Sequence, residues 1–224
     1  MIDTKDCWLK DTCKAVCDNT FCIKLFKLDI LYNEALLSIN QRKHLNLRID
    51  EDGSDRDAFL KLKQIENNIE EFIKNGNNLY LHSINTGCGK TSWALRCIQA
   101  YFNKIWHKSD LTCKALFINV PRFLLALKDN ISHQSDYIEH IKENVLKCDL
   151  VVWDEIGVKS LTEYEHENLL NLINARLDFN KSNIYTSNLS PEELKEKIGD
   201  RLYSRVIHSS IEFGFFGSDK RGIV

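Results

Sequence analysis

The sequence predicts an α/β fold in which a mainly parallel β-sheet is flanked by helices, with a small helical module at the N-terminus. Short apolar runs of strand character alternate with longer segments of helical periodicity over most of the 224 residues. After this module, a glycine-rich loop connects the first apolar run to a helix. Polar or acidic residues directly follow two of the later runs, and open parallel sheets bind ligands at the carboxyl ends of their strands.

The composition is that of a globular protein, with 43% hydrophobic and 28% charged residues. No apolar run approaches the roughly 20 residues that a membrane-spanning helix needs, and the polar N-terminus lacks the apolar core of a signal peptide. We therefore expect a cytoplasmic protein without membrane contact. The formal net charge of −2 provides no overall attraction to nucleic acid, so any contact with DNA has to come from a local patch.

The chain is predicted to have three parts. Residues 1–45 hold a cluster of cysteines followed by one or two short helices, and we interpret them as a metal-binding module. Residues 46–57 are polar, acidic and rich in turn formers, which is typical of a linker. Residues 58–224 contain the alternating strands and helices and form the main domain.

Four cysteines crowd into the N-terminal module: Cys7, Cys13, Cys17 and Cys22. Four thiolates are the right number and type for a closed tetrahedral zinc site, and a bound metal would supply folding energy to so short a stretch. Zinc is favoured over an iron–sulfur cluster because the chain has no C-x2-C-x2-C run. The alternative is a helix on which these cysteines are packing residues. The other four cysteines lie in apolar segments and are interpreted as small buried side chains.

Two periodicities place the elements of the main domain. Apolar runs predict strands at 79–82, 115–120, 150–153, 183–186 and 211–215. Helical periodicity predicts helices at 58–74, 92–106, 122–128 and 137–147. Two further helices begin with capping boxes at Thr162 and Ser190, and the second of them runs to about Val206.

The loop after the first of these strands has the pattern of a phosphate-binding loop. Backbone N–H groups at the start of a helix have no partner inside the helix and can bind phosphate. Lys90 would reach the β- and γ-phosphates, and the Thr91 hydroxyl would bind Mg²⁺. The predicted phosphate-binding residues are Gly87, Cys88, Gly89, Lys90, Thr91 and Ser92. The pattern G-x-x-x-x-G-K-[ST] departs at one position, where Ile84 replaces the first glycine; the alternative is a glycine turn before a helix that carries a lysine by chance.

Polar residues at the ends of two other strands complete a candidate site. Asp154 follows the run 150–153 and is placed to hold Mg²⁺ directly or through water. Glu155 is next to it and would polarise the attacking water as a general base. Asn188 follows the next strand and would orient that water. Taken alone, the acidic pair is equally compatible with an ordinary surface turn, and Asn188 alone would be interpreted as a plain turn asparagine.

Basic residues near the C-terminus are candidates for contact with a phosphate. Arg201 and Arg205 are four residues apart on one helical face, where a guanidinium could reach the γ-phosphate bound by a neighbouring copy. The alternative is a solvated face or a local pair with Asp200. Lys220 and Arg221 follow the last strand, where they would either reach the nucleotide or form a plain basic tail.

With these elements in this order, the sequence resembles the AAA+ ATPases of the DnaC/DnaI/IstB-like group, and most of all phage-encoded helicase loaders with an N-terminal cysteine cluster. The segments that carry the resemblance are the four cysteines, 79–93, 152–157, 186–190 and 199–205. The resemblance implies an AAA+ P-loop domain without a separate lid that binds ATP or ADP with Mg²⁺, and a module that binds Zn²⁺. It implies that Asn188 is sensor I, that Arg201 or, less favourably, Arg205 is the arginine finger, and that Arg221 is the sensor II arginine.

The function that the resemblance implies is ATP-dependent loading of a replicative DNA helicase onto single-stranded DNA, during phage or plasmid-type replication initiation. The cysteine module would dock on the helicase. The AAA+ domain would contact single-stranded DNA, associate with its own copies in a helical or ring-like oligomer, and hydrolyse ATP between protomers in the host cytoplasm.

Three other functions are compatible with parts of the pattern. An IstB-like transposition helper would share every residue of the nucleotide site. A non-hydrolysing adaptor that blocks a helicase or a loader would need no catalytic residues, yet this chain keeps Lys90, Asp154 and Glu155. A small-molecule kinase is disfavoured because no arginine-rich lid segment follows the strand 150–153.

Overall fold

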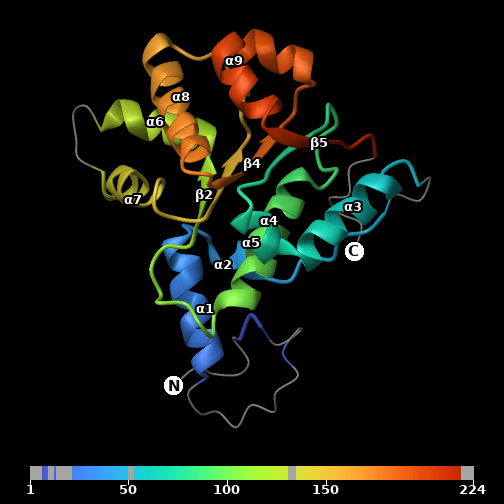
Figure 1. Ribbon diagram of the computed structural model, residues 1–224, viewed down its shortest axis with the longest axis vertical. Coiled ribbons are helices and arrows are strands. Elements are labelled where there is room, and N and C mark those ends of the chain that lie inside the picture. The colour runs from blue at the N-terminus through green and yellow to red at the C-terminus, as the bar shows by residue number, and fades with distance from the viewer. Residues whose placement is uncertain (1–6, 10–12, 14–21, 50–52, 131–134, 218–224) are drawn as a thin grey trace.

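The computed structural model describes residues 7–9, 13, 22–49, 53–130 and 135–217 (Figure 1). Its centre is a parallel five-stranded sheet with the order β2-β3-β4-β1-β5. The strands are β1 (Asn78–His82), β2 (Ala115–Asn119), β3 (Leu150–Asp154), β4 (Ser182–Ser187) and β5 (Ser210–Gly214). The predicted parallel sheet flanked by helices is therefore confirmed.

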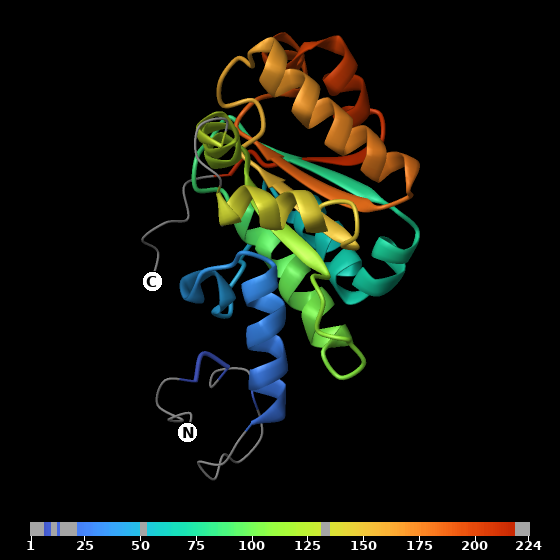
Figure 2. The same ribbon diagram turned by 90° about the vertical axis from the view of Figure 1, so that its left-hand side faces the viewer.

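Helices cover both faces of the sheet (Figures 1 and 2). One face carries α1 (Ile23–Glu34), α3 (Arg56–Asn67), α4 (Ile69–Lys74) and α5 (Lys90–Ile105). The other face carries α6 (Val120–Asp129), α7 (Asp136–Asn144), α8 (Glu163–Asp178) and α9 (Pro191–Ile207). The short α2 (Ile39–Arg42) follows α1.

Strand side chains alternate between the two hydrophobic cores. On β1, Leu79 and Leu81 belong to the core beneath α5, whereas Tyr80 belongs to the core beneath α8 and α9. This alternation follows from the two-residue period of a β-strand. Because both faces are covered, every residue of β1 and β3 is buried, which explains why these strands read as continuous apolar runs in the sequence.

Two predicted helices differ from the observed ones. The segment 58–74 forms two helices, α3 and α4, because Asn68 leaves helical geometry and its side-chain amide donates to the Gln64 carbonyl oxygen (3.1 Å). Helix α9 has a kink at Gly199, whose φ of 78° and ψ of 159° lie in a region that is open mainly to glycine. The capping boxes at Thr162 and Ser190 are confirmed.

Helix α1 packs into the same core as the sheet. Leu28 and Leu31 are fully buried there, and the Phe117 amide of β2 donates to the Ala35 carbonyl oxygen just after α1 (3.0 Å). Trp8 packs edge-on against Tyr32 and donates its indole N–H to Asp29 (3.3 Å). The division into a module of residues 1–45, a linker and an ATPase domain stays a prediction.

Three of the four N-terminal cysteines are described, and Cys17 lies outside the described residues. Cys7, Cys13 and Cys22 are partly buried against the core beneath α5, and the Cys22 sulfur accepts a hydrogen bond from the Leu25 amide at the start of α1 (3.4 Å). Within the described ranges, no three His, Cys, Asp or Glu side chains gather in a way that could hold a metal ion. No described helix is long and apolar enough to cross a membrane.

Glu165 is predicted to make folding stability sensitive to acid. It is buried at the start of α8 and binds Lys159 (2.6 Å) and Lys128 (3.1 Å). Burial opposes its ionisation, but the hydrogen bonds from Lys159, the Thr162 amide and Lys128 outweigh burial and lower its pKa from 4.5 to about 2. Because the folded-state pKa is depressed, the contribution of Glu165 is present above pH ~4.5 and is lost as the pH falls towards 2.

Glu165→Gln should therefore lower the free energy of unfolding by about 1–3 kcal/mol at neutral pH and flatten its decline between pH ~4.5 and 2. Urea unfolding across this pH range measures both effects. Glu163→Gln is the matched control, because Glu163 is an exposed glutamate at the same end of α8. An identical pH dependence in the Glu165 variant and the wild type would contradict the prediction.

Candidate functional site

The sheet order brings three predicted elements to one edge. β4 lies between β3 and β1, so the loop after β1, the pair Asp154-Glu155 after β3 and Asn188 after β4 all emerge at neighbouring carboxyl ends. The register pairs His82 with Ser187 across β1 and β4. Ligands of open parallel sheets bind at such an edge.

The loop between β1 and α5 encloses the side chain of Lys90. Gly89 precedes the helix with a φ of 99°, and Gly87 has a φ of 75°, so both adopt the left-handed conformation that glycine allows. The Lys90 ammonium is buried and donates to the carbonyl oxygens of Ser83 (3.3 Å) and Asn85 (3.0 Å). The backbone therefore curves around a positive charge at the N-terminus of α5, where a helix favours anions.

Ile84, which replaces the first glycine of the loop pattern, has a side chain that points into solvent. It is 74% exposed, and it does not occur among the residues with positive φ. The loop therefore needs neither a small side chain nor left-handed backbone at this position.

Asp154 joins the loop helix to the central strand of the sheet. Its Oδ1 atom accepts hydrogen bonds from the hydroxyls of Thr91 on α5 (2.9 Å) and Thr186 on β4 (2.8 Å). Burial raises the pKa of Asp154, and these two hydrogen bonds oppose that rise. The Thr91 hydroxyl and the Asp154 carboxylate, predicted from the sequence as metal ligands, are thus in direct contact.

Glu155 adopts an unusual backbone conformation next to Asp154. Its φ of 62° is uncommon for a residue with a side chain. The Glu155 amide donates to the Thr186 hydroxyl (3.0 Å), and its carboxylate accepts from the Asn119 side-chain amide (2.9 Å). The contact with Asn119 directs the carboxylate towards the end of β2.

Sequence reasoning missed Asn119 and Thr186 as members of the site. Asn119 is the last residue of β2 and also caps α6 by accepting from the Arg122 amide (3.1 Å). Thr186 contacts both acidic residues from β4. A polar residue near the end of a buried strand was the available signal, but only the strand order shows that β2 and β4 both flank β3.

Asn188 lies just after β4, between the loop and the acidic pair. The chain on either side of it is anchored, because the Ser187 hydroxyl donates to the Ile156 carbonyl oxygen (2.8 Å) and the Tyr80 hydroxyl donates to the Leu189 carbonyl oxygen (3.0 Å). The position of the Asn188 backbone is therefore fixed from both neighbouring strands.

The candidate arginines lie elsewhere. Arg201 is on α9 beyond the kink, and its only ion pair within the described part of the chain is a long contact with Glu167 of α8 (3.8 Å) while its side chain is 75% exposed. Arg201 and Arg205 line a cavity of about 360 Å³ between α8 and α9. Asp200 pairs with Lys195 (3.2 Å), and Arg221 lies outside the described residues.

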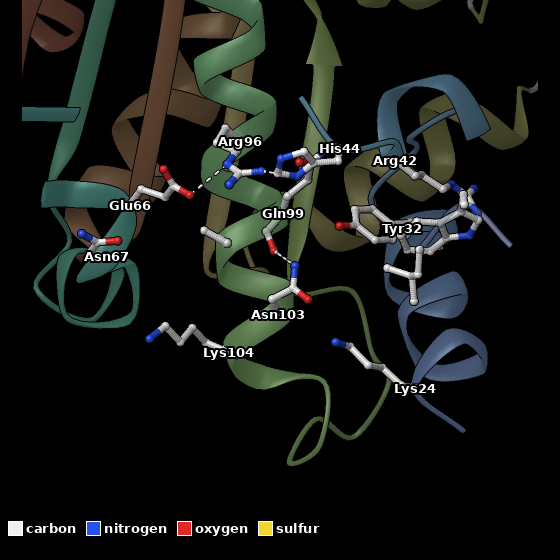
Figure 3. Close-up of a pocket in the computed structure, with 13 residues that line it drawn as sticks. Lys24, Tyr32, Arg42, His44, Glu66, Asn67, Arg96, Gln99, Asn103 and Lys104 are labelled. Carbon is white, nitrogen blue, oxygen red and sulfur yellow. Dashed lines mark hydrogen bonds and ion pairs between the residues drawn. The ribbon is translucent and has the colours of Figure 1, made fainter. Parts of the chain in front are cut away.

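A second cavity, of about 320 Å³, is separate from the strand edge (Figure 3). It lies between α1, the end of α3 and a face of α5, and none of the loop residues or the strand-end residues lines it. Figure 3 shows Arg96 joining Glu66 (2.8 Å) and His44 (2.8 Å) across its upper side, with Lys24 and Lys104 at its lower side.

Comparison with known proteins finds a related sequence among helicase loaders. The chain is 26% identical over 161 residues to the replicative helicase loader DnaC of Escherichia coli strain K12, which covers 72% of this chain and 61% of that protein. It therefore matches less than two thirds of the length of this relative.

Solved structures share the fold. The crystal structure of the DnaC helicase loader superposes with a TM-score of 0.60 at 19% identity, over 77% of this chain and 93% of the other. The structure of a primosome component from Streptococcus pyogenes serotype M3 gives a TM-score of 0.63 at 21% identity, over 86% and 98% of the two chains. Residues 56–211, well over half of the chain, match the family described as IstB-like ATP binding protein, and the chain belongs to this family.

Proposed function

We propose that this chain binds ATP with Mg²⁺ at the carboxyl edge of its sheet and hydrolyses it. The contact between Thr91 and Asp154, beside the loop that encloses Lys90, carries the proposal. A hydroxyl and a carboxylate are oxygen donors of the type that Mg²⁺ takes in nucleotide sites, where it keeps other positions for phosphate and water. The residue set therefore fits this ion, which when bound would neutralise charge on the phosphates.

Nucleotide binding would keep the backbone conformation of the loop and change only the partners of Lys90. The backbone N–H groups of residues 87–92 would receive the phosphates, and Lys90 would exchange its two loop carbonyls for phosphate oxygens. Thr91 and Asp154 would hold the metal ion. Ile84 would leave this cradle unchanged, since its side chain points into solvent.

Hydrolysis would use the residues at the ends of β3 and β4. Glu155 would accept a proton from the attacking water, and Asn188 would orient that water from the neighbouring strand. Asn119 would restrain the Glu155 carboxylate until nucleotide is bound, because it occupies one carboxylate oxygen (2.9 Å). Thr186 would position both acidic residues through its single hydroxyl.

Thr186→Val should lower the rate of ATP hydrolysis by about 10²-fold, because the acidic residues lose their common anchor and a displacement of about 1 Å costs this much. Valine has a similar shape to threonine but cannot form the two hydrogen bonds. Thr186→Ser keeps the hydroxyl and should recover most of the rate. Steady-state phosphate release measures both variants, and unchanged hydrolysis by Thr186→Val would contradict the positioning role.

We propose that this activity loads a replicative DNA helicase onto single-stranded DNA, in phage or plasmid-type replication initiation in the cytoplasm of a bacterial host. The name of the Escherichia coli relative supports this role. Residues 1–45 would dock on the helicase. Binding of ATP would then favour the conformation in which helicase and loader hold each other, and hydrolysis would release them.

Self-association would complete the site. Arg201 and Arg205 are exposed on the second half of α9, so either guanidinium is available to the γ-phosphate bound by a neighbouring copy. A helical or ring-like oligomer on the helicase would supply this neighbour. Arg221 would act within its own chain as a sensor of the nucleotide.

Zinc binding by the N-terminal cysteines stays a proposal of its own. Its support is the number and the density of thiols in residues 7–22. Metal analysis of the purified chain would test it, and Cys17→Ser should abolish a bound zinc. A chain that folds and contains no zinc would favour the packing role that Cys22 has at the start of α1.

Size-exclusion chromatography with light scattering would test the loader role. The full chain would be mixed with the replicative helicase of its host, with and without ATP. Lys90→Ala should lose the ATP-dependent part of complex formation. Lys74→Ala is the matched control, because Lys74 is an exposed lysine at the end of α4.

The outcomes separate the proposals. A complex that forms with wild type and the control but not with Lys90→Ala would support nucleotide-dependent docking, and an unwinding assay would then distinguish loading from blocking. Hydrolysis of ATP without helicase binding would reject the loader role and leave the ATPase site intact. That result would favour the transposition-helper alternative, which would share every residue of the proposed ATPase site.

A further inference from the structure

Two buried cysteines meet at the amino ends of neighbouring strands, at the opposite edge of the sheet from the nucleotide site. Cys113 lies just before β2, and Cys148 lies just before β3. The Asp149 amide donates to the Lys114 carbonyl oxygen (3.0 Å), and Ala115 is paired with Leu150, so the two chain segments run side by side here. Neighbouring strands are about 4.8 Å apart, which is within the range of separations that a disulfide spans.

The two cysteines are neighbours across the two strands and differ in character. The register that pairs Ala115 with Leu150 places Cys113 opposite Cys148, and both side chains belong to the same hydrophobic core. The neighbouring Cys148 thiol, together with burial, raises the pKa of Cys113. Burial also acts to raise the pKa of Cys148, but the neighbouring Cys113 thiol and the positive charge of Arg176 outweigh burial and lower it.

Arg176 provides an independent reason for a negative charge at Cys148. Its guanidinium is completely buried, and its Nη1 atom lies 3.5 Å from the Cys148 sulfur. Its other partners are the Asn183 side chain and backbone carbonyl oxygens, all of them neutral. Among the residues that the structure describes, no carboxylate forms an ion pair with it. A buried charge is usually paired, and Cys148 is the ionisable group whose sulfur contacts this one, so a Cys148 thiolate would be its partner.

We propose that Cys113 and Cys148 are a site of reversible oxidation, at which a small peroxide converts the two thiols into a disulfide. The site combines a sulfur that is held beside a fixed cation with a second cysteine opposite it on the neighbouring strand. A peroxide is a small oxidant, which matters because Cys113 is 6% exposed and Cys148 only 1%. Cys97, a buried cysteine on α5, is a contrasting case, because burial raises its pKa to about 12.

The reaction has two balanced steps. In the first, the Cys148 thiolate attacks one peroxide oxygen, the O–O bond breaks, and hydroxide leaves and takes up a proton to form water. In the second, the Cys113 sulfur attacks the sulfenic acid sulfur, the S–S bond forms, the S–O bond breaks, and the Cys113 proton leaves with the oxygen as a second water. The two sulfurs together lose two electrons, which reduce one peroxide.

Oxidation would change the hydrogen bonding at the point where the end of α1 meets the sheet. The Cys113 S–H group has two acceptors, the Ala115 carbonyl oxygen (3.3 Å) and the Glu34 carbonyl oxygen at the end of α1 (3.5 Å). A disulfide has no proton to donate, so Glu34 would keep only the hydrogen bond from His140 (2.8 Å). The disulfide would also leave the Arg176 guanidinium without its thiolate partner.

Peptide mapping of the full chain would test the proposal. The reduced protein would be freed of reductant, treated with hydrogen peroxide, alkylated in denaturant and digested with trypsin without reduction. Cleavage after lysine places Cys113 in the peptide 109–114 and Cys148 in the peptide 148–159, each with a single cysteine. Cys97 lies in the peptide 97–104 and serves as the buried control within the same sample.

We expect mass spectrometry to find peptides 109–114 and 148–159 joined, with joint loss of their alkylated forms and with reversal by dithiothreitol. In Cys113→Ser, dimedone should trap a sulfenic acid on Cys148, whereas Cys148→Ser should leave Cys113 unmodified. The proposal fails if peroxide leaves both thiols free in the wild type, or if Cys97 reacts as fast as Cys148. The mapping uses the wild-type chain, so it decides the question even if a serine variant does not fold.

Discussion

Glu155→Gln is expected to lower the rate of ATP hydrolysis by about 10²–10⁴-fold, the range that a general base contributes, while the chain still binds ATP. Glutamine has the same size as glutamate, and its carbonyl oxygen can still accept the hydrogen bond that Glu155 takes from Asn119 (2.9 Å). It cannot accept a proton from water. The loop around Lys90 and the Thr91–Asp154 contact are unchanged, so affinity should remain.

Steady-state phosphate release and equilibrium binding of a fluorescent ATP analogue measure the two effects separately. Glu163→Gln is a matched control, since it removes the charge of an exposed glutamate on α8 and should hydrolyse ATP like the wild type. If Glu155→Gln hydrolysed ATP within a factor of about three of the wild-type rate, Glu155 would not be the base, because a factor of this size is below any general-base contribution.

Arg176→Ala is expected to have the largest effect on stability, a loss of about 3–5 kcal/mol in the free energy of unfolding. The guanidinium binds the carbonyl oxygens of Val145, Cys148, Asp149 and Ser182, and the Asn183 side chain. These groups lie at the amino ends of β3 and β4 and just after α7. Removing the side chain would leave several buried acceptors without a donor.

Urea unfolding monitored by tryptophan fluorescence would measure this loss, because Trp153 is buried on β3 and donates to the same Asn183 side chain (3.1 Å). Arg56→Ala is the control, since Arg56 is exposed at the start of α3 and its removal should change stability by less than about 0.5 kcal/mol. Equal stability of the two alanine variants would show that Arg176 is not needed to join the two strands.

Local signals in the sequence were enough to predict the parts of the site that lie within one strand–loop–helix unit. The alternation of Leu79, Tyr80 and Leu81 between two cores is a property of a strand buried on both faces, and such strands read as continuous apolar runs. Gly89 and Lys90 are adjacent in the sequence at the start of α5, so the conformation of the loop depends mainly on residues that are close along the chain.

The rest depended on contacts between distant segments. Asn119 reaches Glu155 because β2 is next to β3, and Thr186 reaches Asp154 because β4 is also next to β3, and no local pattern encodes that order. The opposed positions of Cys113 and Cys148 have the same origin, since they follow from strand register. The kink at Gly199 is different, because its signal is local: a glycine inside a helical pattern. The helical periodicity around this glycine nevertheless favoured a single straight helix.

The place of β4 between β1 and β3 has a consequence for synthesis of the chain on the ribosome. When the loop after β1 and the acidic pair after β3 have both been made, the strand that separates them in the finished sheet is still missing. β1 pairs with β4 and β5, and β3 pairs with β2 and β4, so no strand pairing joins the two halves of the proposed nucleotide site directly. A nascent chain that ends before Ser182 therefore cannot assemble the site, and capacity to bind nucleotide should appear abruptly once β4 has left the exit tunnel and inserted.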